Sequence, residues 1–190
     1  MDGTIVRAHR AAGGAPHDPL DGAAEPAEHA LGRSVGGFTT KLPVISDSNG
    51  VPLAVHLPPG QTHESTQFEA VLEQANIPRV QPRRRRRPRR LSADRAYDAQ
   101  RIRHWLRKRH IQPVIPPIRR RGKRKPGRPV TYDRIAYRKR SSIEQSIGWL
   151  KECRALATRY EKLALNYLGL IKVACIERYL RLLAQAAPAS

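Results

Sequence analysis

The order of strand and helix patterns along this 190-residue chain restricts its fold more than any other feature. Segments rich in β-forming residues occupy positions 3–8, 38–46 and 52–57. A helical pattern begins at Thr62, where polar residues precede apolar residues at helical spacing. The first part of the chain therefore predicts three strands followed by a helix.

The next segments alternate between strand and helix. A strand pattern ends at Asp94, and a helix follows from Asp98, its candidate cap, to about residue 109. The segment QPVIPP then predicts a short strand that proline interrupts. Two helices are expected at the end, from about 132 to 151 and from about 160 to 183. This order predicts an α/β fold with two C-terminal helices.

Other segments lack a regular pattern. Residues 10–36 contain many Gly, Ala and Pro without an apolar period, which predicts a long exposed loop. The arginine-rich segments 79–90 and 118–130 carry too much like charge to be buried, so we expect basic loops there. One domain is the default at this length, and we assign it to residues 1–185, followed by a disordered tail at 186–190.

The charge of the chain indicates its partner. Lys and Arg number 36 against 16 Asp and Glu, a formal net charge of +20. Such a charge repels itself unless a polyanion compensates it, so nucleic acid is the first candidate. No apolar run reaches the roughly 18 to 20 residues that span a bilayer, which argues against a membrane partner. The absence of a signal-like apolar segment and the presence of only 2 cysteines favour a reducing cytoplasm.

The most informative segment runs from Tyr137 to Lys151. At about 100° per residue, a step of seven residues returns to within about 20° of its starting direction. Tyr137, Glu144 and Lys151 therefore share one ridge of the predicted helix, and Arg140 joins it four residues before Glu144. An apolar stripe lies beside this ridge and comprises Ala136, Ile143, Ile147 and Leu150. The helix can pack on a sheet and still present a phenol, two cations and a carboxylate.

These side chains suit a phosphodiester substrate. A carboxylate can hold a divalent cation, while cationic and phenolic groups bind phosphates beside it. Asp2 and Asp94 are the best-placed further acids, because adjacent strands can bring both near the helix that carries Glu144. Two hard cations about 3.5 to 4 Å apart can activate an attacking oxygen and stabilise a leaving one. Asp2, Asp94 and Glu144 are therefore the predicted catalytic and metal-binding residues.

Each acid also has a simpler interpretation. An Asp before Gly, such as Asp2, is more often part of a turn. Asp94 can merely end a strand, and Asp98 is better interpreted as a helix cap than as a ligand. Glu144 can be a solvated acid paired with Arg140, which is worth only a few tenths of a kcal/mol. The shared helical ridge makes Glu144 the strongest candidate.

Five segments carry a more specific pattern. They are DGTIVRAH, GRSVGGFTTK, PLAVHLPPGQTHES, ADRAYD and YRKRSSIEQSIGWLK. The last contains Tyr, two residues, Arg, three residues, Glu, six residues and Lys, which are Tyr137, Arg140, Glu144 and Lys151. From residue 2 to about residue 179 the chain resembles the catalytic domain of DDE transposases from bacterial insertion sequences. Within this family it is most similar to the group named after insertion sequence five and to the related group named after insertion sequence four.

The resemblance implies an RNase H-like domain with a central mixed sheet and flanking helices. It implies that Asp2, Asp94 and Glu144 bind Mg²⁺ or Mn²⁺, as a pair of ions. One site would perform two reactions: water frees a 3′-hydroxyl at the end of the mobile element, and that hydroxyl attacks target DNA. The implied partner is double-stranded DNA in the bacterial nucleoid.

The remaining implied and predicted contacts are to phosphate. By the resemblance, Tyr137, Arg140 and Lys151 position phosphates near the cleaved end. The accumulation of cations in the basic loops favours non-specific phosphate binding over the simpler interpretation of a solvated loop. The predicted loop contacts are Arg83, Arg84, Arg85, Arg86, Arg87, Arg119, Arg120, Arg121, Lys123, Arg124, Lys125 and Arg128.

The start of the chain departs from the family pattern, because members usually carry a helical DNA-binding region before the first Asp. Here Asp2 follows Met1 directly. We therefore expect an N-terminally truncated domain, either the second piece of a frameshifted enzyme or the product of a decayed gene copy. An upstream-frame polypeptide and a second copy of the chain are further candidate partners. The competing functions are an RNase H-like nuclease and an inactive DNA-binding fragment.

Overall fold

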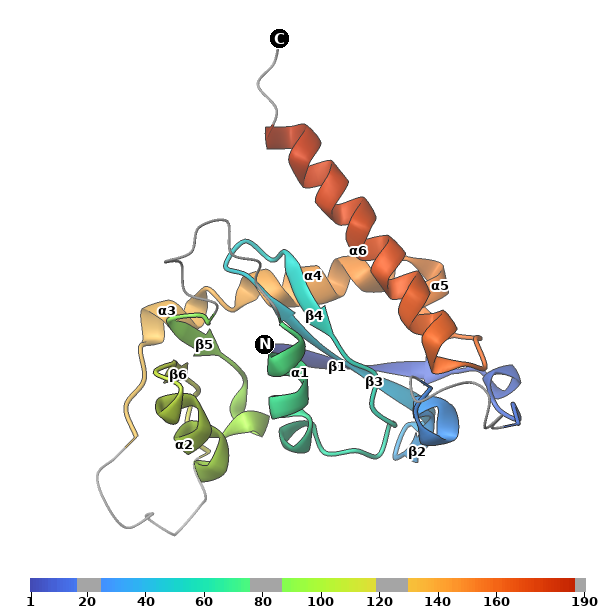
Figure 1. Ribbon diagram of the computed structural model, residues 1–190, viewed down its shortest axis with the longest axis horizontal. Coiled ribbons are helices and arrows are strands. Elements are labelled where there is room, and N and C mark those ends of the chain that lie inside the picture. The colour runs from blue at the N-terminus through green and yellow to red at the C-terminus, as the bar shows by residue number, and fades with distance from the viewer. Residues whose placement is uncertain (17–24, 76–86, 119–129, 187–190) are drawn as a thin grey trace.

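Figure 1 shows the computed structural model, which describes residues 1–16, 25–75, 87–118 and 130–186. One mixed sheet comprises β1 (Asp2–Ala8), β2 (Gly32–Ser34), β3 (Gly37–Ser46), β4 (Pro52–Val55) and β7 (Thr158–Arg159). The order is β2-β3-β1-β7, and β4 also pairs with β3. β1 runs antiparallel to β3 and parallel to β7. The three strands predicted in the first part of the chain are confirmed as β1, β3 and β4.

A second, two-stranded sheet lies beside the first (Figure 1). Its strands β5 (Arg90–Ser92) and β6 (Gln112–Val114) run parallel, and α2 (Gln100–Lys108) connects them. The amino group of Met1 donates a hydrogen bond to the Ser92 carbonyl oxygen over 2.7 Å, which links the start of β1 to the end of β5. The strand predicted to end at Asp94 and the strand predicted in QPVIPP therefore form a sheet of their own.

Helices cover both faces of the larger sheet. Side chains alternate along β3, so Leu42 and Val44 join one core while Ile45 joins the other. The first core includes apolar residues of α4 (Ser141–Glu152), α5 (Arg154–Ala157) and α6 (Ala164–Ala186). The second includes residues of α1 (Phe68–Gln74) and α2. This arrangement of a mixed sheet between helices agrees with the expected RNase H-like α/β fold.

The helix predicted from 132 to 151 is divided into α3 (Arg134–Arg138) and α4. Between them the Arg140 amide bonds to the Tyr137 carbonyl and the Ser142 hydroxyl donates to the Lys139 carbonyl over 3.0 Å. Hydrogen bonds to the residue three positions earlier are typical of a tight 3₁₀ turn. The Ser142 side chain thus bonds a backbone carbonyl at the point where the helix is interrupted. Helical periodicity alone did not predict this interruption.

Two other boundaries were predicted wrongly. Residues 10–36 are not an exposed loop throughout, because β2 lies among them and Leu31 is buried; positions 17–24 lie outside the described residues. The helix expected from Thr62 begins at Phe68, after a separate 3₁₀ turn at Glu64–Thr66. Short Gly-rich strands and isolated turns carry no periodic signal from which they can be predicted.

Asp98 does not cap α2, because Ala99 occupies the cap position. Instead its carboxylate binds the Arg103 guanidinium over 2.7 Å and accepts the Ile118 amide over 2.7 Å. The Arg103 and Asp98 side chains are only 6% and 3% exposed, so the pair is internal. Removing one partner of a buried ion pair costs about 3 to 5 kcal/mol. Asp98 is therefore a structural residue of the second core.

Several predicted segments fall largely outside the described residues. Of the basic loops, the structure describes positions 87–90, 118 and 130, and of the predicted tail it describes Ala186, the last residue of α6. Arg87 is exposed and Arg90 begins β5. Within the described ranges, no helix has the length and apolar content needed to cross a membrane.

Glu25 holds the first turn of α6 from a distant part of the chain. Its buried carboxylate accepts the amides of Ala164 and Leu165 over 2.7 and 2.9 Å and lies 2.8 Å from Nδ1 of His29. The first amides of a helix have no partner within the helix, so an external acceptor stabilises them. Burial by itself raises the pKa of Glu25, but these hydrogen bonds outweigh it and lower the pKa below its ordinary 4.5.

We expect Glu25→Gln to destabilise the fold by about 2 kcal/mol at neutral pH, because hydrogen bonds to a charged acceptor are replaced by weaker ones. A carboxyl group with a lowered pKa stabilises the folded state above its unfolded pKa and loses this effect as the pH falls through its folded pKa. The difference between parent and variant should therefore shrink below pH 4.5. Denaturant titrations from pH 3 to 7 measure this difference in the free energy of unfolding. Glu28→Gln, which replaces an exposed acid, is the control. A difference independent of pH would contradict this role.

Candidate active site

Asp2 and Glu144 are brought together by one arginine. Arg140 donates to Oδ1 of Asp2 over 2.6 Å and to Oε1 of Glu144 over 2.8 Å. The Asp2 and Arg140 side chains are 15% and 12% exposed, whereas Glu144 is 58% exposed. Burial by itself lowers the pKa of Arg140, but Asp2 and then Tyr137 and Glu144 raise it above its ordinary value. Through these two ion pairs, Arg140 links the first residue of β1 to the first turn of α4.

Asp94 lies two residues beyond β5, and its Oδ1 accepts the Ala96 amide over 2.9 Å. The hydrogen bond between Met1 and Ser92 brings this end of β5 to the start of β1. Burial and the charge of Arg140 lower the pKa of the Met1 amino group to about 5, while Asp2 and Asp94 act in the opposite direction. Asp2 is therefore paired with Arg140 at the beginning of β1, and Asp94 follows two residues after the Ser92 carbonyl that binds Met1.

Tyr137 and Lys151 extend the site along the α3–α4 segment. The Arg140 guanidinium carbon lies 6.0 Å from the centre of the Tyr137 ring, within the range of a cation–π contact. Lys151 is exposed in the last turn of α4. At 1.5 Å per residue it lies about 10 Å beyond Glu144 along the helix, a distance that suits a second phosphate rather than the same one.

The donor chemistry of the site fits a hard divalent cation. Asp2, Asp94 and Glu144 offer only oxygen ligands, which Mg²⁺ and Mn²⁺ prefer. Among the described residues, however, no three acidic, histidine or cysteine side chains are close enough to form a ready cation site. Arg140 stands between two of the acids, and its buried Nε has no hydrogen-bond partner in the described part of the chain. A cation at this point would compete with a guanidinium for the same carboxylates.

Glu64 is a further acid near the start of β1 that the sequence analysis did not single out. It lies in the 3₁₀ turn after β4, where we expected only the beginning of a helix. A β-carbon added to Gly3 would lie 3.3 Å from Oε1 of Glu64, so this carboxylate rests against β1 one residue beyond Asp2. Burial and then the charge of Asp94 raise the pKa of Glu64 above its ordinary value, and Lys41 opposes them. In the sequence, the available signal for this residue is its place as an acid among polar residues in the segment QTHES. This segment comes before the apolar residues of the following helix.

Comparison with known proteins decides the family. Residues 1–176 match the family described as Transposase DDE domain. The chain belongs to the DDE transposase family. Its acids at the start of β1, after β5 and on α4 come from three separate parts of this matched region.

Two relatives of this DDE transposase chain are curated. One, described as a transposase for insertion sequence element IS402 of Burkholderia cepacia, is 32% identical over 72% of this chain and 60% of the relative. The other, described as a transposase for insertion sequence element IS6501 of Brucella ovis, is 29% identical over 76% of this chain and 100% of the relative. The chain thus spans 60% of one curated relative and all of the other. No solved structure matches it.

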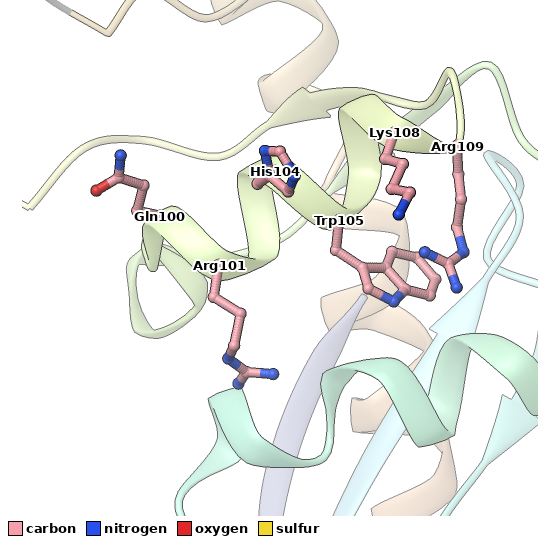
Figure 2. Close-up of a pocket in the computed structure, with 6 residues that line it drawn as sticks. All are labelled: Gln100, Arg101, His104, Trp105, Lys108 and Arg109. Carbon is pink, nitrogen blue, oxygen red and sulfur yellow. The ribbon is translucent and has the colours of Figure 1, made fainter.

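A cationic surface of the DDE transposase chain lies apart from these acids, on the outer face of α2. A hollow there has a volume of about 440 Å³, and its lining residues, drawn in Figure 2, are Gln100, Arg101, His104, Trp105, Lys108 and Arg109. The Arg109 guanidinium stacks 3.6 Å from the centre of the Trp105 ring, and Arg101 pairs with Glu69 over 2.7 Å. Trp105 and Arg109 also line a second hollow with Arg87. Arg109, directly after α2, and Arg87 therefore lie on one hollow.

Proposed function

We propose that this chain is the catalytic part of an insertion-sequence transposase, which cuts DNA at the element end and joins it to a target. The observation that carries the proposal is the Asp2–Arg140–Glu144 ion pairing, and the hydrogen bond from Met1 to Ser92, two residues before Asp94, supports it. It gathers the acids and the arginine of one family signature from distant parts of the sequence. We assign this function to residues 1–185 as a single domain.

In this proposal Asp2, Asp94 and Glu144 hold Mg²⁺ or Mn²⁺, as two ions. Such ions, when bound, activate the attacking oxygen and stabilise the leaving one. The neighbouring side chains bind the substrate. Arg140 can grip two phosphate oxygens with its planar guanidinium, and Tyr137 can donate to a third. Lys151, farther along α4, then holds the adjacent phosphate.

Double-stranded DNA is the proposed partner, in the cytoplasm at the nucleoid. The net charge of +20 and the exposed cations at Arg87 and along α2 support it. Most of the predicted loop contacts, from Arg83 to Arg86 and from Arg119 to Arg128, lie outside the described residues. An upstream-frame polypeptide or a second copy of the chain stays a prediction, which gel filtration of co-expressed proteins can test.

DNA affinity should fall steeply with salt, because each neutralised phosphate contributes a log–log slope of about −0.9 on duplex DNA. Replacing Arg83 to Arg87 with Ala removes up to five of these contacts and should flatten the slope. Fluorescence anisotropy on a random duplex between 50 and 300 mM salt, as a chosen range, measures this change. A slope identical to that of the parent would exclude the run from DNA binding.

Cleavage tests the catalytic proposal. A labelled duplex that carries the element end should yield a new 3′-hydroxyl in Mg²⁺ or Mn²⁺ and none in EDTA. Because Arg140 is paired with both Asp2 and Glu144, the alternative of a DNA-binding fragment has a structural basis as well. Tight DNA binding that does not require a divalent cation, without any cleavage in Mn²⁺, would favour that alternative.

A further inference from the structure

Helix α6 carries apolar side chains on two opposite faces. One face packs into the first core through Tyr167, Ile171 and Cys175. The other face is open, and its large apolar side chains are 53% to 68% exposed; we call this set, which comprises Val173, Ile176, Leu180 and Leu183, the α6 seam. At about 100° per residue, the two faces point about 160° apart. A helix packed on one core needs a single apolar face, so the α6 seam indicates a further packing partner.

The α6 seam has the spacing of a coiled coil. Its members follow one another at intervals of three, four and three residues, so they occupy successive a and d positions when Val173 is placed at a. Gly169 precedes them at the same spacing, and a β-carbon added there would meet no other part of the described chain within 4 Å. In Figure 1 the last turns of α6 extend beyond the other elements. A second helix can therefore lie along the seam.

Two residues of opposite charge flank the α6 seam. Lys172 and Glu177 are both exposed and occupy the g and e positions on its two sides. In a pair of parallel helices, a g residue faces the e residue five positions later on the partner helix. Lys172 of one copy would thus lie beside Glu177 of the other, and the two-fold symmetry of a dimer repeats this contact.

Glu177 can make this contact without losing its present one. Its Oε1 binds the Arg181 guanidinium of the same helix over 2.5 Å, and Oε2 has no partner among the described residues. Antiparallel helices would bring g residues beside g residues, which does not pair these two charges. Charge complementarity therefore favours a second, parallel copy of α6 as the occupant of the seam.

We propose that two copies of this chain associate through the α6 seam, as a parallel two-stranded coiled coil with Lys172–Glu177 pairs along both sides. The buried face of each α6 points away from the seam, so the two domains lie on opposite sides of the helix pair. The inference goes beyond the proposed catalytic function and does not depend on it. The dimer would carry two copies of the proposed active site.

The net charge of each copy opposes this association. Two chains of +20 repel each other, and salt screens exposed charges that are farther apart than about 10 Å at 0.1 M. The burial of apolar side chains in the seam does not depend on this screening. Association is therefore best measured at about 0.3 M salt, where the Debye length is shorter still.

Sedimentation velocity of the full chain over a range of concentrations tests the seam. The parent should form dimers, and the double variant Ile176→Gln, Leu180→Gln should raise their dissociation constant by about 100-fold or more, because each copy loses two apolar contacts. Its fold should survive, since both side chains are more than half exposed and Gln suits a helix. Ile135→Gln, which replaces a 74% exposed side chain on α3, is the matched control and should dimerise like the parent.

Charge reversal tests the parallel arrangement. Lys172→Glu leaves only Glu beside Glu along the seam, and Glu177→Lys leaves only Lys beside Lys, so each variant alone should dimerise more weakly than the parent. An equimolar mixture restores opposite charges on both sides and should form heterodimers. A mixture that associates no better than its separate components would overturn the parallel pairing.

Two further results would overturn the inference as a whole. One is a folded parent that stays monomeric at every concentration, including a monomer that binds an upstream-frame polypeptide through Ile176 and Leu180. The other is a dimer that the Ile176→Gln, Leu180→Gln variant leaves unchanged, which would place the contact on another surface. Both leave the proposed catalytic function intact, because DNA cleavage tests that function separately.

Discussion

Glu144→Gln is expected to lower the rates of DNA cleavage and joining by about 10³-fold or more. Losing charge at a two-metal site removes several kcal/mol of transition-state stabilisation, and each 1.4 kcal/mol corresponds to about a factor of ten in rate. The fold should survive, because the side chain is 58% exposed and Gln has nearly the same helix propensity. The lost surface ion pair with Arg140 is worth only about 0.3 to 0.5 kcal/mol.

The measurement is single-turnover cleavage of a labelled element end in Mg²⁺ and Mn²⁺, with circular dichroism to confirm folding. Asp2→Asn and Asp94→Asn should behave like Glu144→Gln. Glu152→Gln, an exposed acid at the end of the same helix, is the matched control and should retain activity. Near-normal rates in folded Glu144→Gln protein would remove Glu144 from the site and leave the catalytic assignment without its third acid.

Arg159→Met should produce the largest loss of stability. The Arg159 side chain is fully buried, and its guanidinium makes four hydrogen bonds of 2.8 to 3.0 Å. The acceptors are the carbonyl oxygens of His29, Glu161 and Lys162 and the hydroxyl of Thr40. Methionine fills similar space but donates nothing. Each buried acceptor left unsatisfied costs about 1 to 3 kcal/mol, so we expect a total loss of about 4 kcal/mol.

Denaturant unfolding of Arg159→Met compares directly with Arg154→Met, which removes an exposed arginine from α5 and should change stability by less than about 0.5 kcal/mol. A domain of this size is stable by only about 5 to 15 kcal/mol, so the first variant should unfold at a clearly lower denaturant concentration. Equal stability of the two variants would show that the four hydrogen bonds of Arg159 do not stabilise the fold.

The fold could be predicted where a periodic pattern is long. β3 alternates between two cores over 10 residues, and α6 repeats its apolar stripe over 23, so both are visible in the sequence. β2 has 3 residues and β7 has 2, too few for alternation to be recognised. β7 pairs with Arg7 and Ala8 of β1, which lie far away along the chain, whereas β2 pairs with the adjacent β3 across a tight turn. Tertiary context decides such short strands, and local propensity does not.

The candidate site divides in the same way. Helical spacing predicted that Arg140 and Glu144, four residues apart, lie together, and the hydrogen bond between them confirms it, although Tyr137 lies on the separate helix α3. The ion pair between Arg140 and Asp2 joins residues that only the complete fold brings together. The position of Glu64 was not predicted for the same reason, because the turn that carries it lies against Gly3 of another strand. Spacing along a helix predicts which of its side chains are neighbours. Contacts between residues of separate elements can be identified only from the tertiary structure.

The central claim is that this chain joins DNA as well as cutting it, and strand transfer with a pre-cut element end tests it most directly. The labelled substrate carries a free 3′-hydroxyl and is incubated with supercoiled target DNA in Mg²⁺ or Mn²⁺. Our account predicts labelled target molecules that disappear in Asp2→Asn, Asp94→Asn and Glu144→Gln. Shortened DNA without any joined product, from a folded protein that binds the substrate, would contradict the account and identify a nuclease.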